Sequence, residues 1–343
     1  MIACDSGLVD TGASSSLTPK IHIIGLNLYE LYMELAVELA RASPDISRLT
    51  SELISEKSKP IAGRLFASLL DEFRSDLANP GIGMAVVDIP ESRACDTTQN
   101  AFWGVALALG LGSNIFSLGR DRINDTPYTV YAASYRKSKH LADLGLQPIA
   151  PETKLGFHTD GLLAEDKVSM PHNIMLYNID IAYRKPGNFH WVPFSMWGEK
   201  DLYMRRIGVG RPYNIKVTPS VYEGDDGNLE IVSPRHVIAP IFIETESVGT
   251  TLYLNGDVTS AAGDSDFDLA AIDGLRSSLA ANAVRFSVPQ KSRRLIFVRN
   301  VLGAHARDVF DEPSPDALYT RVFLRSVDDN CIELVGGKEE PRP

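Results

Sequence analysis

The first quarter of the chain carries apolar residues at the spacing of one face of a helix. In residues 27–41, 46–57 and 60–78 they recur every three or four positions, which is the period of an amphipathic α-helix. Pro60 fits the first turn of the third segment, where its missing N–H has no cost, and Asn79-Pro80-Gly81 ends that segment. We therefore predict three helices in this part of the chain.

From residue 82 onward the pattern changes to that of strands. Residues 82–89 form an apolar run typical of a buried strand, and a last helical pattern covers 97–110. Further on, short runs of β-branched and aromatic residues alternate with turns such as Lys185-Pro186-Gly187 and Asn255-Gly256-Asp257, which favours a sandwich or a barrel. A helix is expected to interrupt these runs at 270–283, and the expected strands cover residues 126–135, 173–183, 213–219, 228–233, 239–246, 250–256, 284–289, 293–300 and 318–326.

These patterns predict a mainly β fold that carries a helical layer. The length of 343 residues would allow two domains, but closed β-architectures often reach about 200–250 residues as one unit. We expect residues 1–20 to form a flexible N-terminal lead and residues 21–343 to form a single domain, with helices over 27–78 and a β-core over about 82–328.

Composition and charge narrow the class of protein. Hydrophobic residues make up 44% of the chain and charged residues 23%, which excludes collagen, coiled coil and wholesale disorder. The net charge of −10 disfavours nucleic acid or an anionic membrane as the main partner. No apolar run reaches the roughly 20 residues that cross a bilayer, and the N-terminal residues do not have the pattern of a signal peptide. The three cysteines form no CxxC pair, so we expect a soluble, cytoplasmic protein without a thiolate zinc site.

The first chemical signal is the segment His158-Thr159-Asp160. On an extended chain, side chains two residues apart point to one face and lie about 6.6 Å apart, so the imidazole and the carboxylate can bind one cation. They would form two thirds of the two-histidine, one-carboxylate triad that binds ferrous iron. We favour His305 as the third ligand because it follows the strongest late strand, at 293–300. His172 and His190 remain alternatives, since they are nearest in sequence to the first pair.

The second signal lies in the strand pattern at 318–326. Alternation places Arg321 and Arg325 on one face of this strand, with Phe323 between them, while the opposite face is apolar enough to be core. A guanidinium that is enclosed needs an anion, and its planar fork suits a carboxylate. The alternative is that both arginines are solvent-facing charges at a sheet edge.

Together these residues resemble the iron(II)/2-oxoglutarate-dependent oxygenases, and most closely the branch that contains clavaminate synthase and taurine dioxygenase. The HxD pair, a distant histidine and an arginine 16 residues after it follow the order of that family. Asn300, His305 and Arg307 are similar to the branch's stretch of Asn, a short gap and His-x-Arg. The resemblance covers roughly residues 82–328.

The resemblance implies a fold, a reaction and roles for single residues. The fold would be a double-stranded β-helix, the jelly roll of the cupins, with N-terminal helices. The reaction would hydroxylate a C–H bond of a small molecule with dioxygen, coupled to decarboxylation of 2-oxoglutarate to succinate. Asp160 favours hydroxylation over halogenation, because related halogenases have a small residue there; desaturation, ring closure and epimerisation remain open. The implied residues are His158, Asp160 and His305 for Fe(II), Arg321 for the distal carboxylate of 2-oxoglutarate, and Arg325 for an acidic group of the substrate.

Two features bear on the co-substrate and the substrate. Relatives often place a Thr or Ser about thirty residues after the first ligand to assist the co-substrate arginine, whereas residues 187–195 contain no Thr, and His190 or Trp191 is expected at that position. Asp257 lies in a turn that resembles the loop in which relatives present an acid to an amino or guanidinium group; an ordinary turn is the alternative. With Arg325 facing a carboxylate, a zwitterionic amino acid or a derivative is the expected substrate. Residues 197–211 are expected to form either a lid or a solvated loop.

Three other functions stay open from the sequence. One is a taurine-type dioxygenase that acts on a sulfonate or another small anion. Another is a β-barrel binding module that has no catalytic activity. The third is an oxygenase that modifies a protein or a nucleic acid, and the negative net charge disfavours the nucleic-acid version. The sequence does not predict an oligomeric state.

Overall fold

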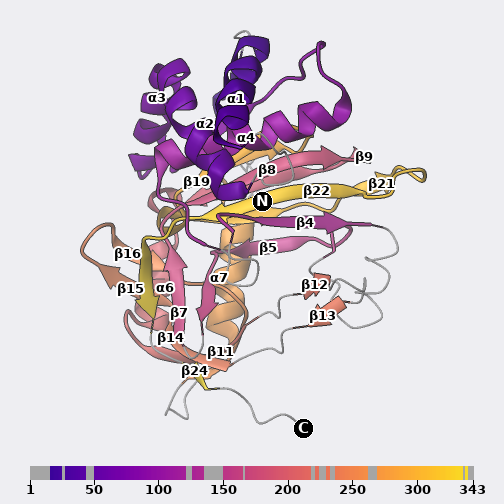
Figure 1. The fold of residues 1–343 in the computed structure, drawn as a ribbon. Coiled ribbons are helices and arrows are strands. Elements are labelled where there is room, and N and C mark those ends of the chain that lie inside the picture. The colour runs from indigo at the N-terminus through magenta and orange to yellow at the C-terminus, as the bar shows by residue number, and fades with distance from the viewer. Residues whose placement is uncertain are drawn as a thin grey trace, which may run out of the picture.

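Two large sheets face each other beneath a layer of helices in the computed structural model (Figure 1). Side chains from both sheets meet in one buried cluster, which includes Val86 and Ile296 of the first sheet and Trp191 and Val288 of the second. These layers confirm the predicted mainly β class with a helical layer. The structure describes residues 16–24, 28–43, 50–120, 126–134, 150–164, 167–217, 221–223, 229–231, 236–261, 269–334 and 337–338.

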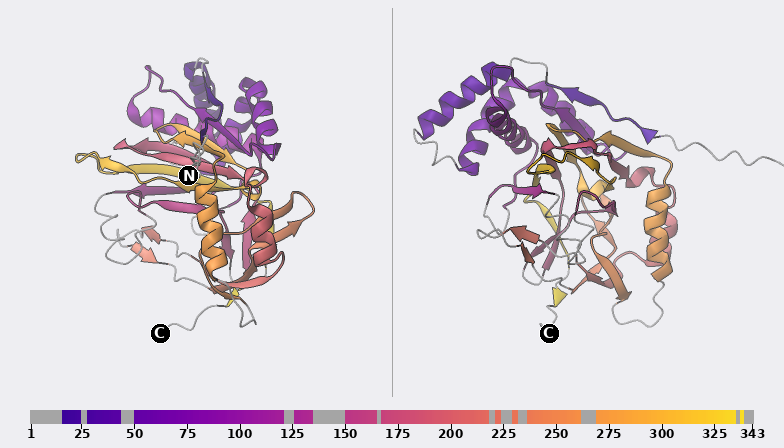
Figure 2. Two further views of the ribbon diagram at one scale, coloured as in Figure 1. Left: turned by 180° about the vertical axis from the view of Figure 1, so that it is seen from behind. Right: turned by 90° about the vertical axis from the view of Figure 1, so that its right-hand side faces the viewer.

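The helical layer covers the outer face of the first sheet (Figure 2). Its members are α1 (Leu28–Ala42), α2 (Ser51–Leu65), α3 (Ala67–Ala78) and α4 (Thr97–Ile115). Asp96 begins α4 with a capping box, in which its side chain accepts from the Gln99 amide and the Gln99 side chain accepts from the Asp96 amide. This cap and the apolar sequence that follows extend α4 five residues beyond the predicted end at 110.

The predicted break before Pro60 is wrong. Pro60 lies inside α2, and the chain changes direction at Phe66, between α2 and α3. Proline removes one backbone hydrogen bond from a helix interior, here the one that residue 60 would donate to the carbonyl of Glu56. Glu56 and Pro60 are both exposed residues. Ile61 and Ala62 are buried in the core, so continued burial holds the helix together past the proline.

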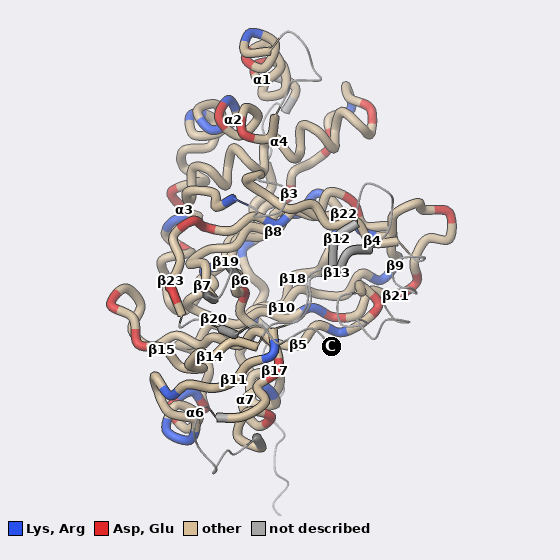
Figure 3. The backbone as a smooth tube through the Cα atoms, turned by 60° about the horizontal axis from the view of Figure 1, so that its bottom comes forward, with Lys and Arg blue, Asp and Glu red and all other residues tan. Residues whose placement is uncertain are grey.

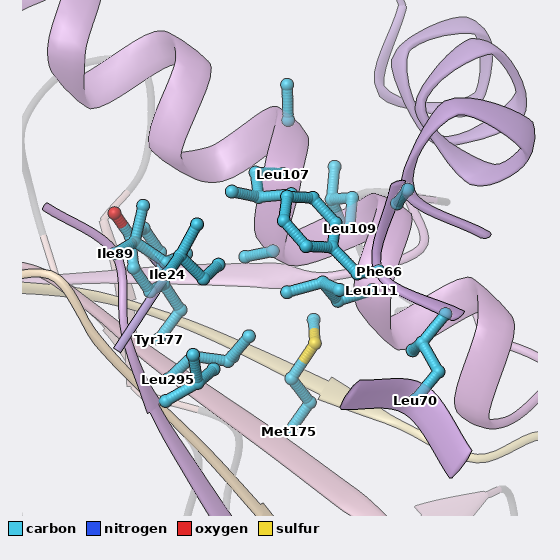
Figure 4. Packing of buried hydrophobic residues seen from close by; sticks show 14 of the residues in the cluster. Ile24, Phe66, Leu70, Ile89, Leu107, Leu109, Leu111, Met175, Tyr177 and Leu295 are labelled. Carbon is cyan, nitrogen blue, oxygen red and sulfur yellow. The ribbon is translucent and has the colours of Figure 1, made fainter. Parts of the chain in front are cut away.

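The core between helices and sheet is built from apolar stripes on both layers. Figure 4 shows Leu107 and Leu111 of α4 close to Phe66 and to Met175 of the sheet below. Each of these four side chains is buried. Burial of a large apolar side chain stabilises the fold by about 1.5–3 kcal/mol relative to exposure, so this contact fixes the helical layer on the sheet.

The first sheet has six strands in the order β2-β3-β19-β8-β22-β4. All residues of β3 and β19 are buried, as their apolar runs predict, and the two strands pair antiparallel. Both faces of the sheet are covered, one by helices and one by the second sheet, which explains the continuous apolar pattern. The strands are β2 (Ile21–Ile23), β3 (Met84–Asp88), β19 (Arg294–Val298), β8 (Ile174–Ile181), β22 (Arg321–Val327) and β4 (Thr129–Ala133).

The second sheet has five strands in the order β1-β18-β10-β20-β5. Its inward face turns toward the first sheet, and its outward face packs against a second cluster of apolar residues, which includes Val192 and Ala304. The strands are β1 (Ser16–Leu17), β18 (Arg285–Pro289), β10 (Asn188–Pro193), β20 (Gly303–Arg307) and β5 (Leu155–His158).

The remaining strands form smaller sheets at one end of the molecule and at its side. The four-stranded sheet β17-β11-β14-β24, the three-stranded sheet β23-β7-β6 and three two-stranded ribbons complete the described strands. Their bounds are β6 (Leu162–Ala164), β7 (Lys167–Pro171), β9 (Tyr183–Lys185), β11 (Pro212–Lys216), β12 (Val221–Glu223), β13 (Leu229–Ile231), β14 (His236–Pro240), β15 (Phe242–Thr245), β16 (Gly249–Leu252), β17 (Asp257–Ala261), β21 (Asp311–Pro313), β23 (Cys331–Leu334) and β24 (Gly337–Lys338).

The segment expected as a lid or a solvated loop, 197–211, is part of the core. Most of it forms α6 (Lys200–Ile207), and Trp197, Tyr203 and Ile207 are buried against α7 (Leu269–Ala281) and the smaller sheets. The clustered charges that suggested a mobile surface occupy the exposed side of α6. The sequence pattern missed this because an eight-residue helix gives few repeats of its period.

The ends of the folded part differ from the boundaries expected from the sequence. Residues 1–15 lie outside the described residues, but β1 pairs in parallel with β18 and therefore joins the second sheet before residue 20. Strands β23 and β24 lie beyond residue 328, the expected end of the β-core, and pair with β7 and β14. Within the described residues, no helix is both long and apolar enough to span a membrane.

A buried ion pair links the end of β3 to the start of β19. Arg294 donates to both carboxylate oxygens of Asp88, with Nε 2.7 Å from Oδ1 and Nη2 3.0 Å from Oδ2. The ammonium of Lys291 lies 2.7 Å from Oδ2. Burial alone would raise the pKa of Asp88, but these two cations outweigh it and lower that pKa.

We expect Asp88→Asn to lower the free energy of unfolding by about 3–5 kcal/mol at pH 7, because Arg294 stays buried without its partner. The lowered pKa stabilises the fold above the pKa of an unfolded Asp, near 3.9, and this contribution is lost as pH falls through the folded value. Urea unfolding should therefore show a constant difference from pH 7 to pH 5 and a smaller one below about pH 4. Asp71→Asn is the control, since its pair with Arg74 is exposed and contributes about 1 kcal/mol or less. A loss in Asp88→Asn no larger than in the control would contradict the assignment.

Candidate metal centre

Two side chains of one short segment and a third from far along the chain meet at the edge of the second sheet, where β5 is the last strand. His158 is the last residue of β5 and pairs directly with His305 on the antiparallel strand β20. Asp160 follows two residues later, and its Oδ1 lies 3.5 Å from His158 Nε2 and 3.6 Å from His305 Nε2. One ligand atom from each residue lies within 4.8 Å of the other two. The structure thus brings together the three residues that the sequence indicated for a metal.

The position of His305 differs from the expectation in one respect. It was expected at the end of the strand 293–300, but a short 3-10 turn, η4 (Asn300–Leu302), ends that region and a new strand follows. His305 is the central residue of β20, in the other sheet. The chain therefore crosses from one sheet to the other between β19 and His305. His172 and His190, the alternatives for the third ligand, do not belong to the cluster.

The two imidazoles are oriented for binding through Nε2. His158 Nδ1 lies 2.9 Å from the carbonyl oxygen of Gly156, a hydrogen bond that places the proton on Nδ1 and leaves Nε2 free. His305 is buried, and the ring of Phe189 stacks on it at 5.6 Å between centroids. Burial, and to a lesser extent His158, lowers the pKa of His305 to about 3. The imidazole is therefore neutral at pH 7, as a metal ligand must be.

The two carboxylate oxygens of Asp160 have different partners. Oδ1 faces the histidines, while Oδ2 accepts from Arg325, with Nε at 2.8 Å and Nη2 at 2.6 Å. Burial would raise the pKa of Asp160, but Arg325 and the two histidines hold it well below its usual range. Asp160 is thus ionised, and Arg325 fixes its rotation.

The main chain of Asp160 is fixed as well, by a residue whose role the sequence did not reveal. Asn300 is fully buried, and its Oδ1 accepts from the Asp160 amide at 2.9 Å while its Nδ2 donates to the Asp160 carbonyl at 2.9 Å. Nδ2 also donates to the carbonyl of Pro171. An Asn directly after an apolar strand was noted for its resemblance to a family motif, but it gave no sign of which backbone it would bind.

Arg321 lies buried without a carboxylate partner among the described residues. Its Nη2 donates to Asn178 Oδ1 at 2.9 Å, and its guanidinium lies 3.9 Å from the ring centroid of Phe323 and 4.9 Å from that of Phe310. Burial and the nearby charge of Arg307 lower the pKa of Arg321 to about 9. A buried guanidinium held by rings and a neutral amide is suited to receive an anion.

Neither residue that was expected to assist Arg321 does so. His190 has its ring nitrogens 2.9 Å from Ser287 Oγ and 3.0 Å from Asp308 Oδ2, and Trp191 Nε1 donates to the carbonyl of Ile82. The assisting residue is Asn178, on β8. Asn178 could not be recognised from the sequence because it lies within an apolar run, 173–183, that is typical of a buried strand.

Arg307 holds the segment that precedes β5 by three backbone hydrogen bonds. It donates to the carbonyl oxygens of Pro151 at 2.7 Å, of Ala150 at 3.0 Å and of Thr153 at 3.0 Å. These three carbonyls precede β5, so one guanidinium fixes the segment that delivers His158. His305 and Arg307 lie two residues apart on β20, and both hold the other strand of the pair. His305 pairs with His158 of β5, and Arg307 binds the segment that precedes β5.

The two residues expected to bind substrate are placed differently. Arg325 lies at the centre, where it holds Asp160. Asp257 begins β17, its side chain is 82% exposed, and Arg276 Nη2 lies 4.0 Å from its carboxylate. None of the described contacts joins Asp257 to the three-residue cluster.

The donor set fits a divalent first-row metal. Two neutral imidazoles and one carboxylate are the ligands that non-heme iron(II) takes when positions stay open for other molecules. The carboxylate is ionised, one nitrogen of each imidazole faces it, and the outer hydrogen bonds of His158 and Asp160 are satisfied within the protein. The residues present therefore fit such an ion.

Comparisons with known proteins give a structural likeness and no sequence match. No family model and no curated protein matches the chain. A structure of asparagine oxygenase in complex with Fe(II), 2S,3S-3-hydroxyasparagine and succinate matches with a TM-score of 0.60 and 16% identity, covering 90% of this chain and 93% of that one. The non-heme iron oxygenase OrfP, in complex with Fe and alpha-ketoglutaric acid, matches with a TM-score of 0.61 and 14% identity over 91% and 94%.

These matches cover 90% and 91% of this chain. At such low identity the likeness concerns the fold, and it confirms the fold that the sequence pattern and the resemblance indicate. The chain therefore has the fold of the iron(II)- and 2-oxoglutarate-dependent oxygenases, in the form found in asparagine oxygenase and OrfP.

Proposed function

We propose that this protein is an iron(II)- and 2-oxoglutarate-dependent dioxygenase that hydroxylates a small amino-acid-like molecule. The observation that carries the proposal is the convergence of His158, Asp160 and His305, with one ligand atom of each within 4.8 Å of the others. Bound there, ferrous iron would supply the oxidising chemistry that couples decarboxylation of 2-oxoglutarate to hydroxylation of the substrate. The protein supplies ligands, orientation and an enclosed site.

The co-substrate would be held by Arg321. Its guanidinium is buried and has no described carboxylate partner, so the distal carboxylate of 2-oxoglutarate would relieve a desolvation cost that the empty protein bears. Asn178 and the rings of Phe310 and Phe323 keep the guanidinium in one orientation. The binding energy is thus not spent on ordering a flexible side chain.

Arg325 would act first on the metal ligand. By accepting two donors on Oδ2, Asp160 presents Oδ1 to the histidines and stays bound through one oxygen. We keep the carboxylate of an amino-acid substrate as the second group that Arg325 would face, because this guanidinium lies at the centre of the site. Asp257 does not support the proposal, since its side chain is exposed beside Arg276.

The amino-acid class rests on the structural neighbours. Asparagine oxygenase was solved with 3-hydroxyasparagine, and OrfP with (3S)-hydroxy-L-Arg and with L-canavanine. A free amino acid or a derivative is the corresponding proposal for this chain. A sulfonate is the competing substrate, and nothing in the described site favours it.

Replacing His305 by Ala should weaken iron binding by more than about 100-fold, because the two remaining side chains cannot hold the ion alone. Anaerobic Fe(II) binding measures this directly, and succinate formation from 2-oxoglutarate should fall with it. His236→Ala, on β14 and outside the cluster, is the matched control and should retain both. Turnover that survives in the His305 variant would refute the metal centre.

Arg321→Gln should raise the KM for 2-oxoglutarate by about 100-fold, since two charge-assisted hydrogen bonds to the co-substrate are lost. The free energy of unfolding should not fall, because the change removes a buried charge that has no carboxylate partner among the described residues. Arg184→Gln alters an exposed arginine and serves as the control for steady-state kinetics and for urea unfolding. An unchanged KM, or a strongly destabilised Arg321 variant, would remove Arg321 from the co-substrate site.

A substrate panel separates the two candidate classes. We expect free amino acids with uncharged or basic side chains to stimulate succinate formation at saturating 2-oxoglutarate, while taurine and other sulfonates leave it at the uncoupled level. Mass spectrometry should find one added oxygen in the stimulated reactions. Stimulation by sulfonates and not by amino acids would reverse the assignment of substrate class without affecting the metal centre.

A further inference from the structure

A pocket of about 330 Å³ lies beside β5, between the outer face of the second sheet, the turn before β17 and α7. His190 pairs with Ala306, whereas its neighbour Trp191 pairs with His305. Because side chains alternate along a strand, His190 points to the opposite face from His305. His190 and Ala306 help to line the pocket from the outer face of the sheet, and the metal ligand His158 borders it at the end of β5.

The position of α7 closes this side of the sheet. The helix runs alongside the strands (Figure 2), and Trp197 Nε1 donates to Ser278 of α7 at 2.7 Å. Arg276 of α7 and Arg285 at the start of β18 both line the pocket, and so does Lys154, just before β5. Figure 3 shows basic positions along the tube near β5 and β17. Three cationic side chains thus line this one pocket.

We propose that this outer pocket is a binding site for a small oxyanion, a carboxylate or a phosphate, held by Arg276, Arg285 and Lys154. Its volume is at the lower end of the range for small-molecule sites, about 300–1,000 Å³. Guanidinium groups bind both kinds of oxyanion through paired N–H donors.

The hydrogen bonds of the two arginines leave donors for such a ligand. Arg276 Nη2 donates to the Gly256 carbonyl at 2.6 Å, and Arg285 Nη1 donates to the Ala280 carbonyl at 3.1 Å. Arg285 Nε is buried and has no hydrogen-bond partner among the described residues. A buried donor without a partner is costly, and an anion in the pocket would satisfy it.

The acidic residues of the pocket only partly offset these cations. Asp308 is engaged by His190 Nε2 at 3.0 Å and by the Asn188 amide at 3.1 Å. Asp257 lies 4.0 Å from Arg276 with its side chain 82% exposed. Of the five charged residues that line the pocket, three are basic, so the site favours an anion over a cation.

Gly156 and His158 of β5 both line the pocket. Gly156 is exposed, and a Cβ placed on it would meet no atom within 4 Å. The Gly156 carbonyl also accepts the hydrogen bond of His158 Nδ1. His158 thus borders both the outer pocket and the metal centre, and the two sites are tested separately below.

Calorimetric titration of the whole protein with inorganic phosphate and with citrate, in separate arms, tests the proposal. Because Arg321 can also receive a carboxylate, the titrations use Arg321→Gln as the starting protein, and we expect one saturable site there, with the tighter arm identifying the preferred oxyanion. Arg276→Gln with Arg285→Gln should weaken binding by about tenfold per guanidinium, and Lys154→Gln should weaken it by a smaller factor, because it removes the third cation of the pocket from an exposed position. Arg93→Gln, an exposed arginine elsewhere, is the matched control and should bind like the starting protein.

The outcomes separate this proposal from the proposed oxygenase function. His305→Ala should lose iron and keep oxyanion binding, since His305 does not line the pocket. Iron binding should conversely remain in the arginine double variant. If neither anion binds saturably, or if binding is unchanged in both the arginine double variant and Lys154→Gln, the outer pocket is not an oxyanion site. Should one of these variants fail to fold in circular dichroism, the other decides.

Discussion

The carboxylate of Asp160 is the point on which the architecture of the site depends. One oxygen faces His158 and His305, and the other is held by Arg325. Without the guanidinium, burial would favour the protonated acid, and a neutral acid is a poor metal ligand. With it, the carboxylate stays charged and offers a single oxygen in a fixed direction.

Long-range pairing makes this arrangement possible. Asp160 and His305 are 145 residues apart in sequence, yet the antiparallel register of β5 and β20 sets His305 opposite His158. Asn300 binds both backbone groups of Asp160 from the turn that precedes β20. The crossing from β19 to β20 therefore delivers a ligand and a clamp within six residues. The apolar cluster between the sheets, in which Trp191 is buried, keeps the register from shifting.

Alternation along strands explains which parts of the site could be predicted from the sequence. The two-residue spacing of His158 and Asp160, and the shared face of Arg321 and Phe323, follow from the geometry of one strand. The contact of Arg321 with Asn178 joins two strands whose pairing is irregular at Val322, and single-strand patterns do not encode such contacts. The partner of Arg325 was missed for the same reason, since a buried arginine shows its need for an anion but not which one.

Burial also overrides local sequence preference in the helical layer and in the segment that contains α6. Pro60 was predicted to start a helix from local preference, and burial of Ile61 and Ala62 overrode that preference. The charged segment that contains α6 was expected at the surface, and its few apolar residues pack it into the core.

The most direct test of the metal centre is a crystal structure with Mn(II) and 2-oxoglutarate, in which anomalous diffraction locates the metal ion. We expect one ion bound by Nε2 of both histidines and by a single oxygen of Asp160, with Arg325 still on the other oxygen. An ion elsewhere, or Arg325 displaced from Asp160, would contradict this arrangement.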